Sequence, residues 1–134
     1  MKIRNFEEND YREVCELLQA QNVEPPAEVE ELNGPCFIAE DDNKKIIGCI
    51  FALVGQSTKA YVDFLAVDSA YHGTMVFSYL LAALEHMLQF MGVKRYVFHV
   101  EKNNHKTYAQ LYKYREKYGI IKLRDLHYFS KEIA

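Results

Sequence analysis

The chain has 134 residues, of which 49% are hydrophobic and 26% charged, a balance typical of a globular protein in water. This length favours one domain over residues 1–134, with a core of its own. The formal net charge of −3 disfavours nucleic acid as the main partner, because nucleic-acid-binding domains are usually basic. Without an apolar leader or a run of about 18 apolar residues, the sequence predicts a cytoplasmic protein with no membrane partner.

The three cysteines, Cys15, Cys36 and Cys49, are odd in number and far apart, and no Cys-x-x-Cys pair is present. This spacing indicates neither a disulfide framework nor a metal site. We therefore expect reduced cysteines that pack as small apolar side chains, and no metal.

The N-terminal third predicts a strand and two helices. Alternating apolar residues indicate a strand over residues 1–5. Asp10, with Glu13 three residues later, has the pattern of a capping box for a helix that ends near Asn22. Two prolines follow, and the second can occupy the first turn of a short helix over residues 27–32.

Three strands joined by polar turns come next. They cover residues 36–40, 45–54 and 59–67, which are rich in β-branched and aromatic side chains. The spacing of the turns is that of antiparallel hairpins. Gly48, inside the second of these strands, indicates a bulge or a close contact with another element.

The apolar run over residues 74–91 predicts a helix that is buried on most sides. Its narrow polar face consists of Ser78, Ala82, Glu85, His86 and Gln89. Core packing is the simplest role for its large apolar side chains, and a homodimer seam is the alternative role. These side chains are Met75, Phe77, Met87, Phe90 and Met91.

After Gly92 ends this helix, a strand follows over residues 95–101. A helical crossover makes that strand parallel to residues 59–67. Asn103 and Asn104 can cap a further helix over residues 105–118, and short strands are expected over residues 121–124 and 127–133. The fold class is therefore α+β, a mixed and mostly antiparallel sheet with a central parallel pair and flanking helices.

The loop of residues 68–73, between strand and helix, is the clearest candidate site. A loop that opens a helix presents unpaired N–H groups and the positive end of the helix dipole. Such a loop suits an anion, including a diphosphate.

Residues 67–81, VDSAYHGTMVFSYLL, resemble the signature V-D-P-x-Y-R-G-x-G-x-G-x-x-L-L of the GNAT superfamily, the acyl-CoA-dependent N-acetyltransferases. The matching positions are Val67, Asp68, Ala70, Tyr71, Gly73, Leu80 and Leu81. The departures are Ser69, His72, Met75 and Phe77, where the family has proline, arginine or glutamine, and two glycines. Met75 and Phe77 either obstruct the close approach of phosphate that glycines allow or point elsewhere.

A second segment resembles the family signature N-x-x-A-x-x-L-Y-x-x-x-G-F. Its counterparts here are Asn104, Tyr108, Leu111, Tyr112 and Gly119. Asn104 stands one residue early, and the span from Tyr112 to Gly119 is three residues longer than in the signature.

The resemblance implies the GNAT fold, with acetyl-CoA as cosubstrate and a primary amine of a small molecule or protein as acceptor. In that fold the two parallel strands splay apart and the pantetheine arm lies between them, beside backbone groups of residues 65–67. A bulge there would leave an N–H for the thioester oxygen. Residues 23–32 would shape the access of the acceptor. The implied cofactor-binding residues are Leu65, Ala66, Val67, His72, Gly73, Thr74, Met75, Val76, Phe77 and Asn104.

Acetyl transfer to an amine needs a base for the ammonium and an acid for the leaving thiolate. Asp63 stands where many family members carry the base, and strand alternation places it with Leu65 and Val67, opposite Val62, Phe64 and Ala66. An ion pair or edge exposure is the alternative role for Asp63, and Glu40 is a second candidate base. The family often uses the tyrosine at Tyr112 as the acid, unless this side chain only packs on an amphipathic helix.

His72 can stand as a cation beside a diphosphate or be merely solvated. His99, within a strand, is expected to be structural. A basic cluster can face the 3′-phosphate of CoA or form a solvated helix face. Its members are Lys102, His105, Lys106, Lys113, Arg115 and Lys117.

The function predicted is therefore an acetyl-CoA-dependent N-acetyltransferase. The alternative is a catalytically inactive GNAT-fold binding protein with a degenerate CoA site, since a fold does not determine function.

Overall fold

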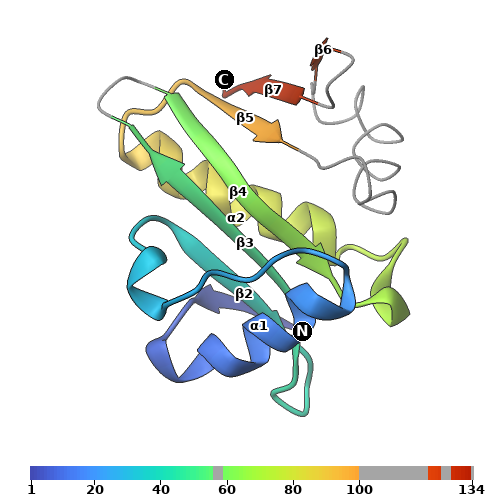
Figure 1. The fold of residues 1–134 in the computed structure, drawn as a ribbon. Helices are drawn as coiled ribbons and strands as arrows, with labels where there is room; N and C mark the ends of the chain where they lie inside the picture. Colours follow the sequence, from blue (N-terminus) through green and yellow to red (C-terminus); the bar gives the residue numbers. More distant parts are fainter. Residues whose placement is uncertain (56–58, 100–120, 125–127, 134) are drawn as a thin grey trace.

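The computed structural model describes residues 1–55, 59–99, 121–124 and 128–133. In these residues the chain forms a sheet of seven strands in the order β1-β2-β3-β4-β5-β7-β6. Figure 1 shows α1 against one face of the sheet and α2 against the other. The strands are β1 (Lys2–Asn5), β2 (Cys36–Glu40), β3 (Ile46–Val54), β4 (Lys59–Val67), β5 (Arg95–His99), β6 (Ile121–Arg124) and β7 (Tyr128–Glu132). The helices are α1 (Tyr11–Ala20) and α2 (Val76–Phe90), with 3-10 turns η1 (Glu8–Asp10), η2 (Val29–Glu31) and η3 (Ser69–Tyr71).

The sheet is mixed, with one parallel pair near its centre. β4 and β5 run parallel, joined by α2 as a crossover, whereas the pairs β1–β2, β2–β3, β3–β4, β5–β7 and β6–β7 are antiparallel. The predicted α+β class and its central parallel pair are confirmed.

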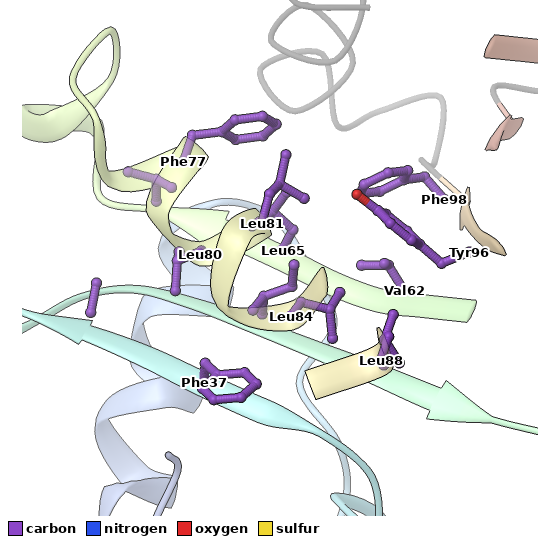
Figure 2. Close-up of a cluster of buried hydrophobic side chains, with 14 of the residues drawn as sticks. Phe37, Val62, Leu65, Phe77, Leu80, Leu81, Leu84, Leu88, Tyr96 and Phe98 are labelled. Atoms are coloured by element: carbon purple, nitrogen blue, oxygen red, sulfur yellow. The ribbon is translucent and has the colours of Figure 1, made fainter. Parts of the chain in front are cut away.

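Two apolar clusters, one on each face of the sheet, hold the helices in place. On the α2 face the helix buries Val76, Phe77, Leu80, Leu81, Leu84 and Leu88. Figure 2 shows these side chains meeting others from the sheet, including Phe37, Leu65 and Tyr96. On the α1 face, Val14, Leu17 and Leu18 pack against sheet residues that include Cys49, Phe51 and Phe64. Burial of this kind, at about 25 cal/mol per Å² of apolar surface, is the main stabilising contribution to the fold.

The start of α2 lies directly on β3. A Cβ atom added to Gly48 would be 2.9 Å from Leu80 Cδ1 and 3.0 Å from Val76 Cγ1. The close contact predicted for Gly48 is therefore confirmed. Because Gly48 pairs with Val67, the first turn of α2 is placed beside the end of β4.

A buried ion network ties β1, β2 and η1 together. The Arg4 guanidinium donates to both Asp10 carboxylate oxygens, at 2.8 and 2.9 Å, and to Glu40 Oε2 at 3.2 Å. Asp10 Oδ2 also accepts the Glu7 N–H at 2.8 Å. Asp10 is the N-cap residue of α1, as predicted, but the predicted capping box with Glu13 was wrong, because the carboxylate of Asp10 makes no capping bond to α1 and binds Arg4 and the Glu7 N–H.

This network predicts a dependence of stability on pH. The hydrogen bonds from Arg4 hold the pKa of Asp10 below its ordinary value of 3.8, against the opposing effect of burial. Since the folded pKa is the lower one, ionised Asp10 stabilises the fold above that ordinary value, and the contribution is lost as the pH falls through the folded pKa. Urea unfolding at a series of acidic pH values should show a steeper loss in the wild type than in Asp10→Asn. Equal slopes in the two proteins would contradict this role.

Several predicted element bounds differ from the structure. The short helix expected over residues 27–32 is only the 3-10 turn η2, and α2 begins at Val76, two residues later than expected. Core packing holds for Phe77, but Met75, Phe90 and Met91 are exposed, Phe90 by 88%. Their role in a homodimer seam stays a prediction. The helix expected over residues 105–118 lies outside the described residues.

Candidate active site

β4 parts from β5 before it ends. The parallel pairing runs from Lys59 opposite Arg95 to Val62 opposite Phe98, whereas β4 continues to Val67. Within the described residues, the last part of β4 is therefore paired on its β3 side only. In the described residues this agrees with the splay between parallel strands that the resemblance implied.

A β-bulge lies where the two strands part. In the β3–β4 ladder Ala52 pairs with Val62 and Phe51 pairs with Phe64, so that Asp63 is an extra residue. The bulge changes the phase of β4, and Val62 packs on the α2 face together with Leu65. The prediction that Val62 shares a face with Phe64 was therefore wrong. The resemblance implied a bulge at residues 65–67, whereas the bulge in the structure is at Asp63, just before them.

Beyond Val62, the edge of β4 that faces away from β3 carries amide groups that no described residue pairs, and it is called the free edge below. The Asp68 N–H donates to Ile47 O of β3 at 2.8 Å. Because N–H directions alternate along a strand, the Ala66 amide also faces β3, and those of Leu65 and Val67 face the opposite edge. In the described part of the chain, nothing pairs there with the Leu65 N–H and C=O or the Val67 N–H. Leu65 and Val67 are only 5% and 3% exposed. Because backbone N–H and C=O groups close to the core need hydrogen-bond partners, these groups favour an extended ligand that carries amides of its own.

His72 forms a hydrogen bond with the Val67 carbonyl, the other backbone acceptor on this edge of β4. Its Nε2 lies 2.8 Å from the Val67 carbonyl oxygen, and because a carbonyl only accepts, Nε2 is the donor. The ring is half-buried. One nitrogen of the predicted cation is thus committed to the backbone, so His72 is not merely solvated.

The loop after β4 is held by short local hydrogen bonds. Asp68 Oδ1 accepts the Ala70 N–H at 2.9 Å, and the Thr74 hydroxyl donates to the Tyr71 carbonyl at 2.6 Å. Gly73 has a φ of +81°, a left-handed conformation that glycine adopts without strain.

Donors remain at the end of this loop. Among the described residues, no acceptor meets the N–H groups of Gly73, Met75 and Ser78. With the positive end of the α2 dipole, they lie where the sequence predicted an anion site, and binding of an anion there stays a prediction.

The two side chains that replace the signature glycines point in different directions. Met75 is 53% exposed, whereas Phe77 is 2% exposed and packs in the α2-face cluster with Leu65 and Leu81, as Figure 2 shows. Phe77 therefore points into the core, whereas the Met75 thioether stays at the loop, with its Sδ 4.0 Å from the Ser78 hydroxyl.

The candidate bases differ in their surroundings. Asp63 is exposed at the bulge. Glu40 is buried and accepts from Arg4, so the structure assigns Glu40 to the ion network and the prediction of a second base there is corrected.

Residues 23–32, expected to shape acceptor access, are held by hydrogen bonds at Pro26 and, just after the segment, at Pro35 near the bulge. The Tyr11 hydroxyl donates to Pro26 O at 2.6 Å, and Pro35 O accepts the Ala52 N–H at 3.0 Å. Ala52 is the partner of Val62, next to Asp63. Gly34 permits this approach, because a Cβ atom there would lie 2.3 Å from Ala52 O. In the sequence, Gly34 is marked only by its place in an Asn-Gly-Pro turn signal, which does not predict its contact with β3.

A separate cavity of about 330 Å³ lies beside the first turn of α2. Its described lining residues come from the chain around Met1, from β3 and its preceding turn, and from the loop and first turn of α2. Since none of them belongs to β4 or β5, this cavity is distinct from the free edge of β4.

The two buried cysteines, Cys36 and Cys49, are unreactive thiols. All three cysteines of the chain are free thiols, and burial raises the pKa of Cys36 to about 12 and that of Cys49 well above its ordinary range. Such thiols stay protonated and are poor nucleophiles at neutral pH.

Among the described residues, no group of histidine, cysteine and acidic side chains is arranged to hold a metal ion, and no helix is long and apolar enough to cross a membrane. Tyr112, Asn104 and the basic cluster of residues 102–117 lie outside the described residues, so their predicted roles stay predictions.

A family model described as the acetyltransferase (GNAT) family matches residues 2–115. The chain belongs to the GNAT family. The resemblance in residues 67–81 is thereby confirmed. A comparison with curated proteins gave no match.

Solved structures of GNAT proteins share the fold over nearly the whole chain. The ribosomal-protein-S18-alanine N-acetyltransferase from Escherichia coli has a TM-score of 0.79 and 18% identity, covering 99% of this chain and 94% of its own. The diaminobutyrate acetyltransferase from Paenibacillus lautus, solved with L-2,4-diaminobutyric acid and coenzyme A, has a TM-score of 0.78 and 20% identity, covering 98% and 94%. A GNAT acetyltransferase from Staphylococcus aureus has a TM-score of 0.79 and 14% identity, covering 99% of both chains. The predicted GNAT fold is confirmed.

Proposed function

We propose that this GNAT protein transfers the acetyl group of acetyl-CoA to a primary amine of a small molecule or a protein. The observation that carries the proposal is the free edge of β4. The side chains of Leu65 and Val67 there are buried, but no described strand pairs with their backbone groups on this edge, and a loop with unpaired N–H donors follows directly. An extended ligand with amides at one end and phosphates at the other fits both parts. Acetyl-CoA is such a ligand.

In this proposal the two parts of the site hold different parts of the cosubstrate. The Leu65 N–H and C=O and the Val67 N–H pair with the amides of the pantetheine arm. The backbone donors of Gly73, Met75 and Ser78 receive the diphosphate. The solved GNAT structures with bound coenzyme A support this assignment by analogy of fold.

The chemistry proposed is direct transfer in a ternary complex. The amine nitrogen attacks the thioester carbonyl carbon, a C–N bond forms, the C–S bond breaks, and the products are an N-acetyl amide and CoA. Asp63, exposed at the bulge, takes the proton that the ammonium must lose, and Tyr112 is proposed to protonate the leaving thiolate. The S18-alanine and diaminobutyrate enzymes, both named for amine acceptors, support an amine as acceptor.

Binding of the cosubstrate is the first test. Acetyl-CoA at about 100 times its dissociation constant should stabilise the fold by roughly 2.7 kcal/mol, because a ligand that binds only the folded state shifts the unfolding equilibrium. Thermal unfolding with and without acetyl-CoA measures the shift, and free CoA should produce a similar one. Unchanged unfolding at millimolar ligand would contradict the proposal.

The alternative function, a GNAT-fold binding protein without catalysis, is favoured by one observation. Met75 and Phe77 replace both signature glycines of the phosphate loop. Release of free thiol from acetyl-CoA in the presence of a panel of amines separates the two functions. Stabilisation by CoA without any turnover would support the alternative.

A further inference from the structure

We propose that His72 is a positioning residue that sets the register of the acyl-CoA arm on the edge of β4. The inference rests on the proposed function and deepens it. His72 does this through the Val67 carbonyl, to which its Nε2 donates at 2.8 Å.

The direction of the Val67 carbonyl follows from the ladder. In a trans peptide the C=O and the next N–H point in opposite directions. Because the Asp68 N–H bonds to Ile47 of β3, the Val67 C=O points to the other edge, the one that β5 has left. Without His72, this carbonyl would be a free acceptor at the end of the open edge.

Occupation of that carbonyl changes what the edge offers. Along the described part of this edge, from Leu65 to Val67, the groups without a partner are two donors, the N–H groups of Leu65 and Val67, and one acceptor, the Leu65 C=O. An extended ligand with several amides can slide along a uniform strand edge, because each register satisfies similar hydrogen bonds. When the Leu65 C=O is the acceptor without a partner, an N–H of the pantetheine arm can pair with it in one register only. An arm shifted along the strand would lose that hydrogen bond.

The position of the ring depends on the turn next to it. His72 is followed by Gly73, whose φ of +81° reverses the chain into α2. The side-chain hydrogen bonds of Asp68 and Thr74 stay within the loop and the first turn of α2, and the Asp68 carboxylate also forms an ion pair with Lys45, before β3, at 3.7 Å. Among the described residues, the ring of His72 is thus the link from the loop back to the edge of β4.

Two substitutions separate the hydrogen bond from the mere presence of a polar side chain. Glutamine places an N–H at a reach similar to histidine Nε2, whereas the shorter asparagine resembles Nδ1 and cannot reach Val67. His72→Gln should therefore retain the bond and His72→Asn should lose it. The control is His86→Asn, because His86 is exposed on α2, away from the edge.

Calorimetric titration of each protein with coenzyme A and with adenosine 3′,5′-bisphosphate, which lacks the pantetheine arm, tests the proposal. Loss of one hydrogen bond and slippage of the arm should weaken coenzyme A binding to His72→Asn by about tenfold, with bisphosphate binding changed by less than about twofold. His72→Gln and His86→Asn should bind both probes like the wild type. A purely structural role for His72 would lower the unfolding midpoint without changing the ratio of the two affinities.

An unchanged affinity ratio in His72→Asn, or the same loss in His72→Gln, would overturn this inference and leave the proposed function standing. Failure of the unaltered protein to bind coenzyme A would overturn both.

Discussion

Replacing Asp63 with asparagine should lower kcat/KM for acetyl transfer by roughly 10²- to 10⁴-fold, the usual contribution of a general base. An acceptor amine is mostly protonated at neutral pH, and the amide of asparagine cannot take its proton. Asp63 stands at the bulge, where β4 leaves β5 and its side chain is exposed. Steady-state kinetics with acetyl-CoA and a reactive amine measure the loss.

The pH dependence distinguishes a base from a structural residue. In Asp63→Asn the loss should shrink as the pH rises toward the pKa of the acceptor, because more of the amine is then already neutral. The matched control is Glu16→Gln, an exposed acid on α1 whose exchange should leave kcat/KM unchanged. A deficit of Asp63→Asn that stays constant with pH, or an activity equal to that of wild type, would remove Asp63 from the mechanism.

The largest effect on stability is expected at Arg4. Arg4→Met leaves the carboxylates of Asp10 and Glu40 buried without their cation, and breaking a buried ion pair in this way costs about 3–5 kcal/mol in free energy of unfolding. The measurement is urea unfolding near neutral pH.

Arg12→Met is the matched control for Arg4→Met. Its ion pair with Glu16 is open to solvent, with the two side chains 91% and 64% exposed, so the change should be below about 1 kcal/mol. The triple variant Arg4→Met, Asp10→Asn, Glu40→Gln should recover part of the loss, because no buried charge is left unpaired. A cost for Arg4→Met as small as that of Arg12→Met would show that the network is not stabilising.

The order of elements could be predicted because the period of the apolar residues changes along the chain. Period-two stretches give way after Gly73 to a long apolar run and then return to a strand at Arg95. A helical crossover between two strands makes them parallel, and it places the end of β4 and the start of α2 at one site. The loop signature of residues 67–81 then pointed to the GNAT family, which the match over residues 2–115 confirmed.

The change of phase at Asp63 escaped prediction because alternation was extended through the bulge. Lys59 to Asp63 alternate between less and more buried side chains, but four apolar residues follow at 64–67. The end of the alternation at Asp63 was the local signal that the strand changes the face to which its side chains point. A strand buried on both faces gives the same run of apolar residues.

Partners distant in sequence account for the other errors. Asp10 has the local pattern of a helix cap, yet Arg4 reaches it from β1 and Glu40 completes the network from β2. Phe90 looks like a core residue by composition, but it lies at the last position of α2, on the side turned away from the sheet, and remains 88% exposed. Neither outcome is encoded within a few residues of the side chain concerned.

Because Asp63 is an extra residue in β4, the number of residues in this strand is more strictly constrained than the identity of the residue at position 63. Deletion of one residue at position 63 would restore plain alternation between β3 and β4. Ala60 and Val62 would then turn toward the α1 face and Tyr61 toward α2, if residues 64–67 kept their places. The fold therefore tolerates a different side chain at position 63 better than an insertion or deletion there, which would invert half of a central strand.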